Sequence, residues 1–464
     1  MPFLSMRTLP LLLLALATGC SDGGTDDTGG TGDNGGQPSG AFESVSARLS
    51  TGVSTVVIVD WTIAGEVEEA WVEYGADEGY GSRAPVRPDN PTEALILGVT
   101  AETEVHFRVG VKINGESRYS DDETITTGSL PSGFVEYTVQ ELVPGAQWGN
   151  FLLTSVYDTG SGYSNLLILN KQGDIVWYLP PVEGFMPSAR FSADGQAILY
   201  ILYPSVFESE SAQIHRLSMD GETASAVDTP FCHHDFVEMP DGSYTCLQST
   251  YQTIDNWDLV GDKLTNIALD GTMTELWDAF DEITPVETPD WPNKLTPEGV
   301  DWTHANGLWY DEPTDAFYVS FYHFMEIRKI TAVDSHTEWI FGGEDGDFAI
   351  TGGRFGPQHA PMIIDGGILM FDNSSNETES SINAYTLDWE AHRATMTYQY
   401  LHPDHRHANI MGDADLLESG YLATAWGDVG HEVIYDPDGT PVWRLDGILP
   451  IVTCQVYAKN NLYR

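Results

Sequence analysis

Short runs in which apolar and polar residues alternate dominate the chain from about residue 42 onward. In the first part of the chain they cover residues 55–61, 70–75 and 106–111. Alternation with a period of two over such short lengths is typical of β-strands with one buried face. Trp61 lies on one of these runs, where a large aromatic side chain fills the space between two packed sheets. Residues 41–130 are therefore predicted to form a small β-sandwich.

From about residue 133 the strand pattern repeats itself. A strand, a turn with glycine and a second strand that often carries tryptophan recur at residues 166–177, 215–226, 266–277 and 433–443. The turn glycines are separated by 48, 50 and 168 residues, and the last interval equals three steps of 56; they are Gly173, Gly221, Gly271 and Gly439. This regular spacing indicates an internal repeat of about 50 residues.

A second hairpin pattern alternates with the first. It covers residues 189–200, 233–247, 304–321, 358–371 and 412–426. Together with a first unit at residues 150–179, the two patterns define six units, each long enough for two hairpins. Repeats of about 50 residues with four strands apiece are typical of propeller blades. The predicted fold is all-β: a six-bladed β-propeller over residues 133–464, preceded by the sandwich.

The first 40 residues read as a targeting segment followed by a linker. One basic residue, a short apolar run and the small residues 17–19 precede Cys20, as in a signal peptide over residues 1–20. The triplet ending in Gly-Cys resembles a bacterial lipobox, which implies a lipid on Cys20, and Ser21 after it resembles an outer-membrane sorting signal. Simple secretion is the alternative. Residues 21–40 are almost all Gly, Asp, Thr and Ser, so a disordered tether is expected between anchor and body.

The charge of the chain restricts its partners. Seventy acidic residues against 20 basic ones give a formal net charge of −50, which repels nucleic acid and anionic lipid, so contact with a membrane is expected only through the lipid anchor. Two interpretations of the acidity stay open. One is solubility in a salty or divalent-rich exterior, and the other is calcium binding by carboxylate clusters, although the sequence has no EF-hand or nonapeptide calcium repeat.

Three cysteines remain after Cys20. Export permits a disulfide. Cys232 and Cys246 flank a turn at residues 240–242, but the expected hairpin register does not place them opposite each other, so the pairing of Cys232, Cys246 and Cys454 stays open. The odd number leaves at least one thiol free unless two chains are joined, and a homodimer is likewise left open.

Histidines occupy the same phase in successive blades. His234 precedes the hairpin glycine Gly242 by eight positions, His359 precedes Gly367 by eight, and His304 begins the unit between them. Because the first strand of every propeller blade runs along the central channel, residues in equal phase converge there. Neutral imidazole can act as a nucleophile, a general base or a metal ligand. A histidine-only zinc site is the rival interpretation, to which the segment His405, Arg406 and His407 could add ligands.

At these residues the sequence resembles the bacterial arylsulfotransferase family. The resemblance covers about residues 133–464 and rests on HHDFVEMPDG, DWTHANGLWYDE, FGPQHAPMIIDGGILMFDN and VYAKNNLYR. It implies transfer of sulfate between phenols at the centre of a six-bladed propeller, without a nucleotide donor or other cofactor. It also implies that His359 is the nucleophile that becomes sulfated. His304, with His234 or its neighbour His233, would bind sulfate or move the phenol proton.

The sequence departs from this family at one important position. After the strand of the fourth blade, YVSFYHFMEI places Tyr322 where the family has an arginine that neutralises sulfate oxygens. Tyrosine donates one hydrogen bond and carries no charge, so Arg354 and Arg406 are the candidates to replace the lost cation. Asp301 and Asn306 flank His304, where they would orient it or cap a turn, and Asn306 is also a candidate substrate-binding residue.

Two functional hypotheses follow. The first is an exported, arylsulfotransferase-like enzyme that moves sulfate from an aryl sulfate ester to a phenol through a sulfohistidine. The second is a non-catalytic or metal-dependent propeller that binds an aromatic or sugar ligand. The N-terminal sandwich resembles a fibronectin type III module through the strand-borne Trp61, VEYG and the segment 107–127, which implies a spacer or dimer contact. The segment 371–374 is expected to be a strand that ends in a polar turn.

Overall fold

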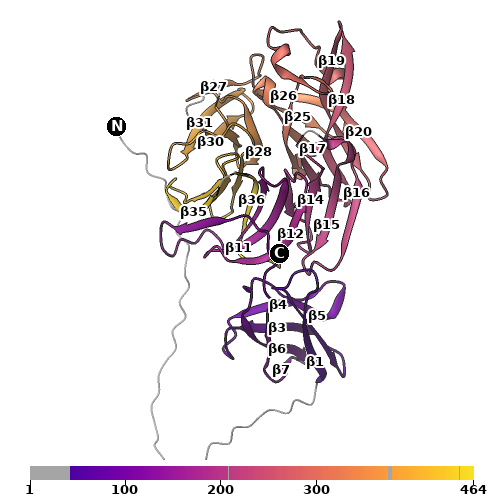
Figure 1. Cartoon of the computed structure of the whole chain (residues 1–464), viewed down its shortest axis with the longest axis vertical. Helices are drawn as coiled ribbons and strands as arrows, with labels where there is room; N and C mark the ends of the chain where they lie inside the picture. Colours follow the sequence, from indigo (N-terminus) through magenta and orange to yellow (C-terminus); the bar gives the residue numbers. More distant parts are fainter. Residues whose placement is uncertain (1–41, 207, 375–378, 449, 464) are drawn as a thin grey trace, which may run out of the picture. The chain divides into compact units, whose positions relative to one another are not determined.

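The structure, a computed structural model, describes residues 42–206, 208–374, 379–448 and 450–463. The predicted signal peptide, the predicted lipid-attachment residue Cys20 and the predicted linker all lie outside these residues. Strands account for nearly all regular structure (Figure 1), which confirms the all-β prediction. In the part of the chain that is described, no helix has the length and apolar character needed to cross a membrane.

Residues 42–126 form one curled eight-stranded sheet. Its strand order is β1-β2-β5-β4-β3-β6-β7, and β8 pairs with β6. Trp61, which is 3% exposed, packs there with Val59 and Phe107, as the alternation predicts. The sheet is consistent with a sandwich-like module, and the type III resemblance stays a prediction. The strands are β1 (Phe42–Leu49), β2 (Val57–Ile63), β3 (Glu69–Gly75), β4 (Ser82–Arg87), β5 (Asn90–Ile96), β6 (Glu104–Ile113), β7 (Glu116–Tyr119) and β8 (Glu123–Thr126).

Six sheets contain the strands of the rest of the described chain and form the blades of the propeller; their pairings are antiparallel except for β19 with β22 and β27 with β31. From the inner strand outward, blade 2 is β13 (Ala189–Phe191), β14 (Ala197–Leu202), β15 (Gln213–Ser218) and β16 (Ala224–Asp228); blade 3 is β17 (Cys232–Glu238), β18 (Tyr244–Ile254), β19 (Trp257–Ile267) and β20 (Met273–Asp278); blade 4 is β23 (Ala305–Asp311), β24 (Ala316–Phe321), β25 (Glu326–Thr331) and β26 (His336–Gly342); blade 5 is β28 (Gln358–Ile364), β29 (Gly367–Asp372), β30 (Ser381–Asp388) and β31 (Arg393–Leu401).

The ring is closed by both ends of the propeller segment. Blade 1 consists of β10 (Phe151–Asp158), β11 (Tyr163–Asn170) and β12 (Ile175–Glu183), and its inner strand is β36 (Ile451–Lys459) from the end of the chain. Blade 6 consists of β32 (Asp413–Leu416), β33 (Leu422–Ala425), β34 (His431–Tyr435) and β35 (Pro441–Gly447), to which β9 (Tyr137–Glu141) adds an outer strand. Short extra strands extend blades 3 and 5: β21 (Leu295–Thr296), β22 (Gly299–Asp301) and β27 (Ala349–Thr351).

The structure answers the question of cysteine pairing, which the sequence leaves open. Cys232 and Cys246 form a disulfide, and Cys454 is free and buried. The two cysteines are indeed not opposite each other, because Cys232 pairs with Gln248 and Cys246 with Phe236. A bulge between His233 and Phe236 shifts the register and lets the two sulfurs meet diagonally.

Candidate functional site

A cavity of about 760 Å³ lies where the first strands of several blades begin. His234 of blade 3, His304 just before the first strand of blade 4 and His359 of blade 5 all line its wall, together with His233 and Tyr322. The ring centres of His234 and His304 are 5.1 Å apart, and the Tyr322 ring lies 5.2 Å from His304 and 5.6 Å from His359. The structure thus brings together the three histidines that share a phase in the sequence.

The backbone at the start of each of these strands aims the histidines at the channel. His234, His304 and Ala360 have φ of +55°, +52° and +48°, values that non-glycine residues seldom adopt. Register shifts occur at the same places in β17, β23 and β28. A bulge redirects side chains relative to the regular alternation, and such features are enriched beside active sites. Three blades therefore use the same local distortion to present a histidine.

His359 is held as a neutral imidazole with one free nitrogen. Its side chain is 4% exposed, and its Nδ1 lies 2.7 Å from Asn373 Oδ1. The Asn373 amide donates to the carbonyl oxygens of Ala408 and Met411, which fixes its oxygen toward His359. His359 Nδ1 must therefore carry the hydrogen, and Nε2 keeps its lone pair. Burial lowers the pKa of His359 to about 3, so the ring is neutral at physiological pH.

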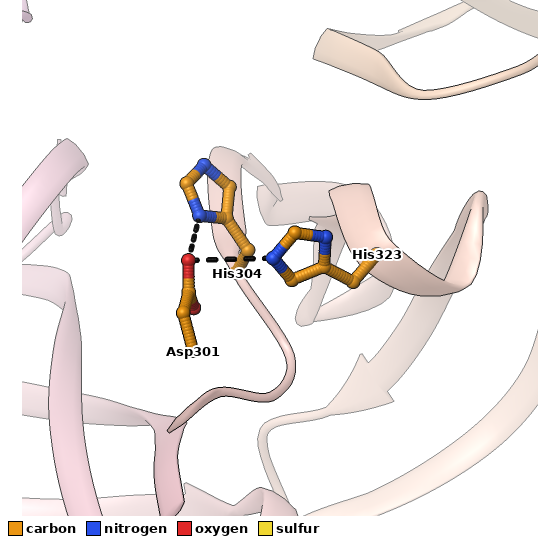
Figure 2. A group of neighbouring side chains, drawn as sticks. All are labelled: Asp301, His304 and His323. Carbon is orange, nitrogen blue, oxygen red and sulfur yellow. Dashed lines mark hydrogen bonds and ion pairs between the residues drawn. The ribbon is translucent and has the colours of Figure 1, made fainter. Parts of the chain in front are cut away.

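A carboxylate shifts His304 in the opposite direction, towards the protonated form. Figure 2 shows Asp301 between two imidazoles: its Oδ2 lies 2.5 Å from His304 Nδ1 and 3.3 Å from His323 Nε2. Removal from bulk water disfavours a charged ring, but the Asp301 carboxylate outweighs this and raises the pKa of His304. The other nitrogen of His304 points away from Asp301 (Figure 2). His304 can therefore hold a proton and give it to a group in the cavity.

A second carboxylate supports the histidine pair of blade 3. Asp262 Oδ1 lies 2.9 Å from His233 Nε2, and His233 Nδ1 lies 2.8 Å from His234 Nδ1. Asp262 Oδ2 also accepts the backbone N–H of Ala305, at 2.6 Å, and so ties blade 3 to the start of β23. Burial lowers the pKa of His234 well below its usual value. His234 therefore offers a neutral polar surface to the cavity.

The cavity contains no lysine or arginine among its described lining residues. Tyr322 lies in the cavity wall, and burial raises the pKa of its hydroxyl. Arg354 and Arg406 are exposed and do not line the cavity. Lys294 acts electrostatically on His304 but lies outside the lining, with its ammonium 3.7 Å from Asp290. Within the described cavity wall, His304 is therefore the group best able to carry positive charge.

Several other residues singled out in the sequence lie outside the cavity wall. Asn306 donates to the carbonyl oxygen of Gln358 at 2.8 Å and so supports the residue before His359. His405 pairs with Glu379 at 2.7 Å, and His407 is also absent from the lining. The sequence pattern indicates no role for Asp262 or His323. For Asn373 a signal existed: it and His359 lie at equal distances from Gly366 in one hairpin.

Two groups of described residues place potential metal ligands within 4.8 Å of one another. One is Asp301 with His304 and His323, two imidazoles and a carboxylate, a donor set that suits zinc. The other is His402, Asp404 and His431, but His402 Nδ1 already accepts the Asp404 N–H and its Nε2 lies 3.0 Å from His431. The set His234, His304 and His359 forms no such group in the described residues.

The fold and the site define a six-bladed propeller with a histidine-lined cavity at its centre. A model of the family described as arylsulfotransferase (ASST) matches residues 149–422, more than half of the chain. The chain therefore belongs to the arylsulfotransferase family, as the motifs predict. No curated protein matches it.

Solved structures with a similar course of the chain are remote in sequence. A protein of unknown function from Bacteroides caccae is 14% identical, with 66% of this chain and 98% of that one covered and a TM-score of 0.43. TolB from Acinetobacter baumannii is 11% identical, with coverage of 78% and 81% and a TM-score of 0.43. A virginiamycin B lyase from Staphylococcus aureus is 14% identical, with coverage of 66% and 88% and a TM-score of 0.35.

Proposed function

We propose that this protein transfers sulfate from an aryl sulfate ester to a phenol through a sulfohistidine at His359. The observation that supports the proposal is the state of His359: Asn373 holds the hydrogen on Nδ1, and Nε2 keeps its lone pair beside the cavity. A neutral imidazole is a competent nucleophile, and a positioned one saves the entropy of bringing the reactants together. No nucleotide donor enters the reaction.

In the first half-reaction, His359 Nε2 attacks the sulfur of the ester. The N–S bond forms while the bond from sulfur to the aryl oxygen breaks, and the electron pair of that bond leaves with the phenolate. The protonated His304 donates its Nε2 proton to the phenolate oxygen, so a neutral phenol departs and His304 becomes neutral. Asp301 holds His304 in the orientation and charge state for this step.

The second half-reaction reverses these steps with another phenol. Neutral His304 accepts the hydroxyl proton of the acceptor, the acceptor oxygen attacks sulfur, and the N–S bond breaks with its electron pair returning to His359 Nε2. One aryl sulfate and one phenol have then become a new aryl sulfate and a new phenol. Tyr322, whose ring contacts both His304 and His359, offers its hydroxyl to a sulfate oxygen.

A specific observation favours a second candidate function. The cavity has no lysine or arginine in its described wall, and a missing charged donor in a desolvated anion site costs about 3 kcal/mol, roughly a hundredfold in rate. A propeller that binds an aromatic or sugar ligand without turning it over would need no such cation. The second hypothesis is therefore a binding protein on the same fold.

Release of 4-nitrophenol from its sulfate ester, with phenol as the acceptor, tests the proposal. The wild type should release it in a phenol-dependent way, and His359→Ala should lose this activity by roughly 10³-fold or more. His336→Ala is the matched control, because His336 is exposed on β26 and absent from the cavity wall. Mass spectrometry should find one added SO₃ group on the peptide with His359 when the acceptor is withheld. A folded wild type without turnover would support the binding protein instead.

A further inference from the structure

The mouth of the cavity combines aromatic rings with carboxylates. Phe231 and Tyr251 line it, with ring centres 5.9 Å apart in an edge-to-face arrangement, and Tyr251 is 47% exposed. Glu210 and Glu298 line the same cavity and are exposed. We call these four residues the mouth cluster. Glu210 lies in the short 3-10 helix before β15, Phe231 directly before β17, Tyr251 on β18 and Glu298 in the turn between β21 and β22.

The carboxylates of the mouth cluster act electrostatically on its tyrosine. Burial raises the pKa of the Tyr251 hydroxyl, and the charges of Glu298 and Glu210 raise it further. Neither glutamate is paired with a lysine or arginine within the described residues, and no such residue lines the cavity. Both negative charges therefore act on whatever enters the mouth.

The backbone holds Phe231 in a conformation that a bulky side chain seldom adopts. Its φ is +63°, and a bulky residue in this region costs free energy that the surrounding structure must offset. Its N–H donates to Ser209 O at 2.8 Å, and its carbonyl oxygen accepts the N–H of Ser249 at 3.0 Å. Ser209 lies next to Glu210 and Ser249 lies two residues before Tyr251, so these two bonds fix Phe231 between the other parts of the cluster.

We propose that the mouth cluster binds an ammonium group, so that the preferred phenols of this enzyme carry a cationic amine on a short chain. Aromatic faces and carboxylates are the groups that attract organic cations. Apolar and aromatic residues of the same cavity wall, which include Tyr157, Phe185 and Met411, accept the ring of such a phenol. The phenol oxygen then reaches His304 and His359 while the ammonium stays at the mouth.

This inference rests on the proposed sulfate transfer and adds the charge of the substrate to it. The sulfate ester of an amine-bearing phenol has no net charge, because its ammonium balances its sulfate. An acidic mouth repels an anionic ester but not this one. A donor and an acceptor of this class therefore suit a cavity that has no lysine or arginine among its described lining residues.

Three acceptors that differ only at the end of a two-carbon chain test the inference, with 4-nitrophenyl sulfate as the donor. They are tyramine (an amine), tyrosol (an alcohol) and 4-hydroxyphenylacetate (a carboxylate). In the wild type, kcat/KM for tyramine should exceed that for tyrosol by roughly three- to tenfold, and the carboxylate should be poorest. The preference should weaken in high salt, since the mouth is open to solvent.

Charge-neutral variants show whether the mouth cluster causes the preference. In the double variant Glu210→Gln with Glu298→Gln, the ratio of kcat/KM for tyramine to kcat/KM for tyrosol should fall to about one. Glu418→Gln is the matched control: Glu418 is exposed and absent from the cavity wall, so the wild-type ratio should persist although the net charge changes.

The outcomes separate the two proposals. Transfer to tyrosol that equals or exceeds transfer to tyramine would overturn the inference and leave sulfate transfer standing. If no acceptor is used, sulfate transfer fails, and calorimetric binding of tyramine and tyrosol without a donor still tests the mouth: tighter binding of tyramine, lost in the double glutamine variant, supports it, and equal binding overturns it.

Discussion

Asn373 determines which nitrogen of His359 carries the hydrogen. Its own orientation is fixed by two carbonyl groups, so a structural feature of the blade 5–6 junction sets the chemistry of the cavity. The phase of the histidines could be predicted because strand starts recur at fixed distances from turn glycines. The role of His323 could not be read in the same way, since it depends on a turn after β24 that no periodicity records. For Asn373 the equal distance from Gly366 is a signal, but the bulge in β28 beside His359 is not recorded by any periodicity.

At the same scale, Asp301→Asn should affect donors unequally. Without the carboxylate the pKa of His304 falls, so less of the ring is protonated at a given pH and the basic limb of the pH–rate profile moves to lower pH. With phenyl sulfate, whose phenolate needs a proton, kcat/KM should drop by about 10²-fold. The loss with 4-nitrophenyl sulfate should be smaller, because its leaving group is a more stable anion. Equal losses and an unmoved profile would mean that Asp301 only supports the fold.

Strands and hairpins form the next scale, and most of them could be predicted from the sequence. Each predicted hairpin from residue 166 to residue 443 corresponds to a pair of adjacent strands, because alternation and turn glycines are local signals. The closing strands β36 and β9 could not be predicted in this way. Their partners lie about 300 residues away in the sequence, and nothing local marks that pairing.

The hairpin β17–β18 depends on its disulfide. Cys232 and Cys246 enclose a separation of 14 residues, and a bridge over such a loop contributes about 2–3 kcal/mol. Denaturant unfolding of Cys232→Ala with Cys246→Ala should show a loss of this size. A reductant should weaken the wild type equally and leave the double variant unchanged. If the reductant leaves the folded wild type as stable as before, the bridge does not support the bulge that carries His233 and His234.

On the scale of the whole molecule, the buried acid Glu432 lies where blade 6 meets blade 1 and the ring closes. Glu432 on β34 is 0% exposed; it accepts a hydrogen bond from Thr154 of blade 1, and its Oε2 has no partner within the described residues. Burial raises the pKa of Glu432 from 4.5 to about 8. The folded protein therefore holds a proton that the unfolded chain releases above about pH 4.5.

This acid should make the ring less stable as the pH rises. Its stabilising contribution is complete below about pH 4.5 and is lost as the pH increases through about 8. Glu432→Gln cannot titrate, so its free energy of unfolding should fall less between about pH 5 and pH 9 than that of the wild type, with a difference on the order of a few kcal/mol. Denaturant unfolding of both proteins at the two pH values measures this difference. An equal fall in the free energy of unfolding in both proteins would show that Glu432 does not keep its proton in the folded state.

The position of β36 has a consequence for the order in which the protein is made. Blade 1 lacks its inner strand until residues 451–459 have been synthesised, although β10, β11 and β12 leave the ribosome some 300 residues earlier. Until then the nascent chain has an open edge next to the channel, which invites pairing with other chains. The ring around the histidine cavity therefore closes only after β36 has been made, and a chain that stops before β36 contains His234, His304 and His359 without the closed ring around them.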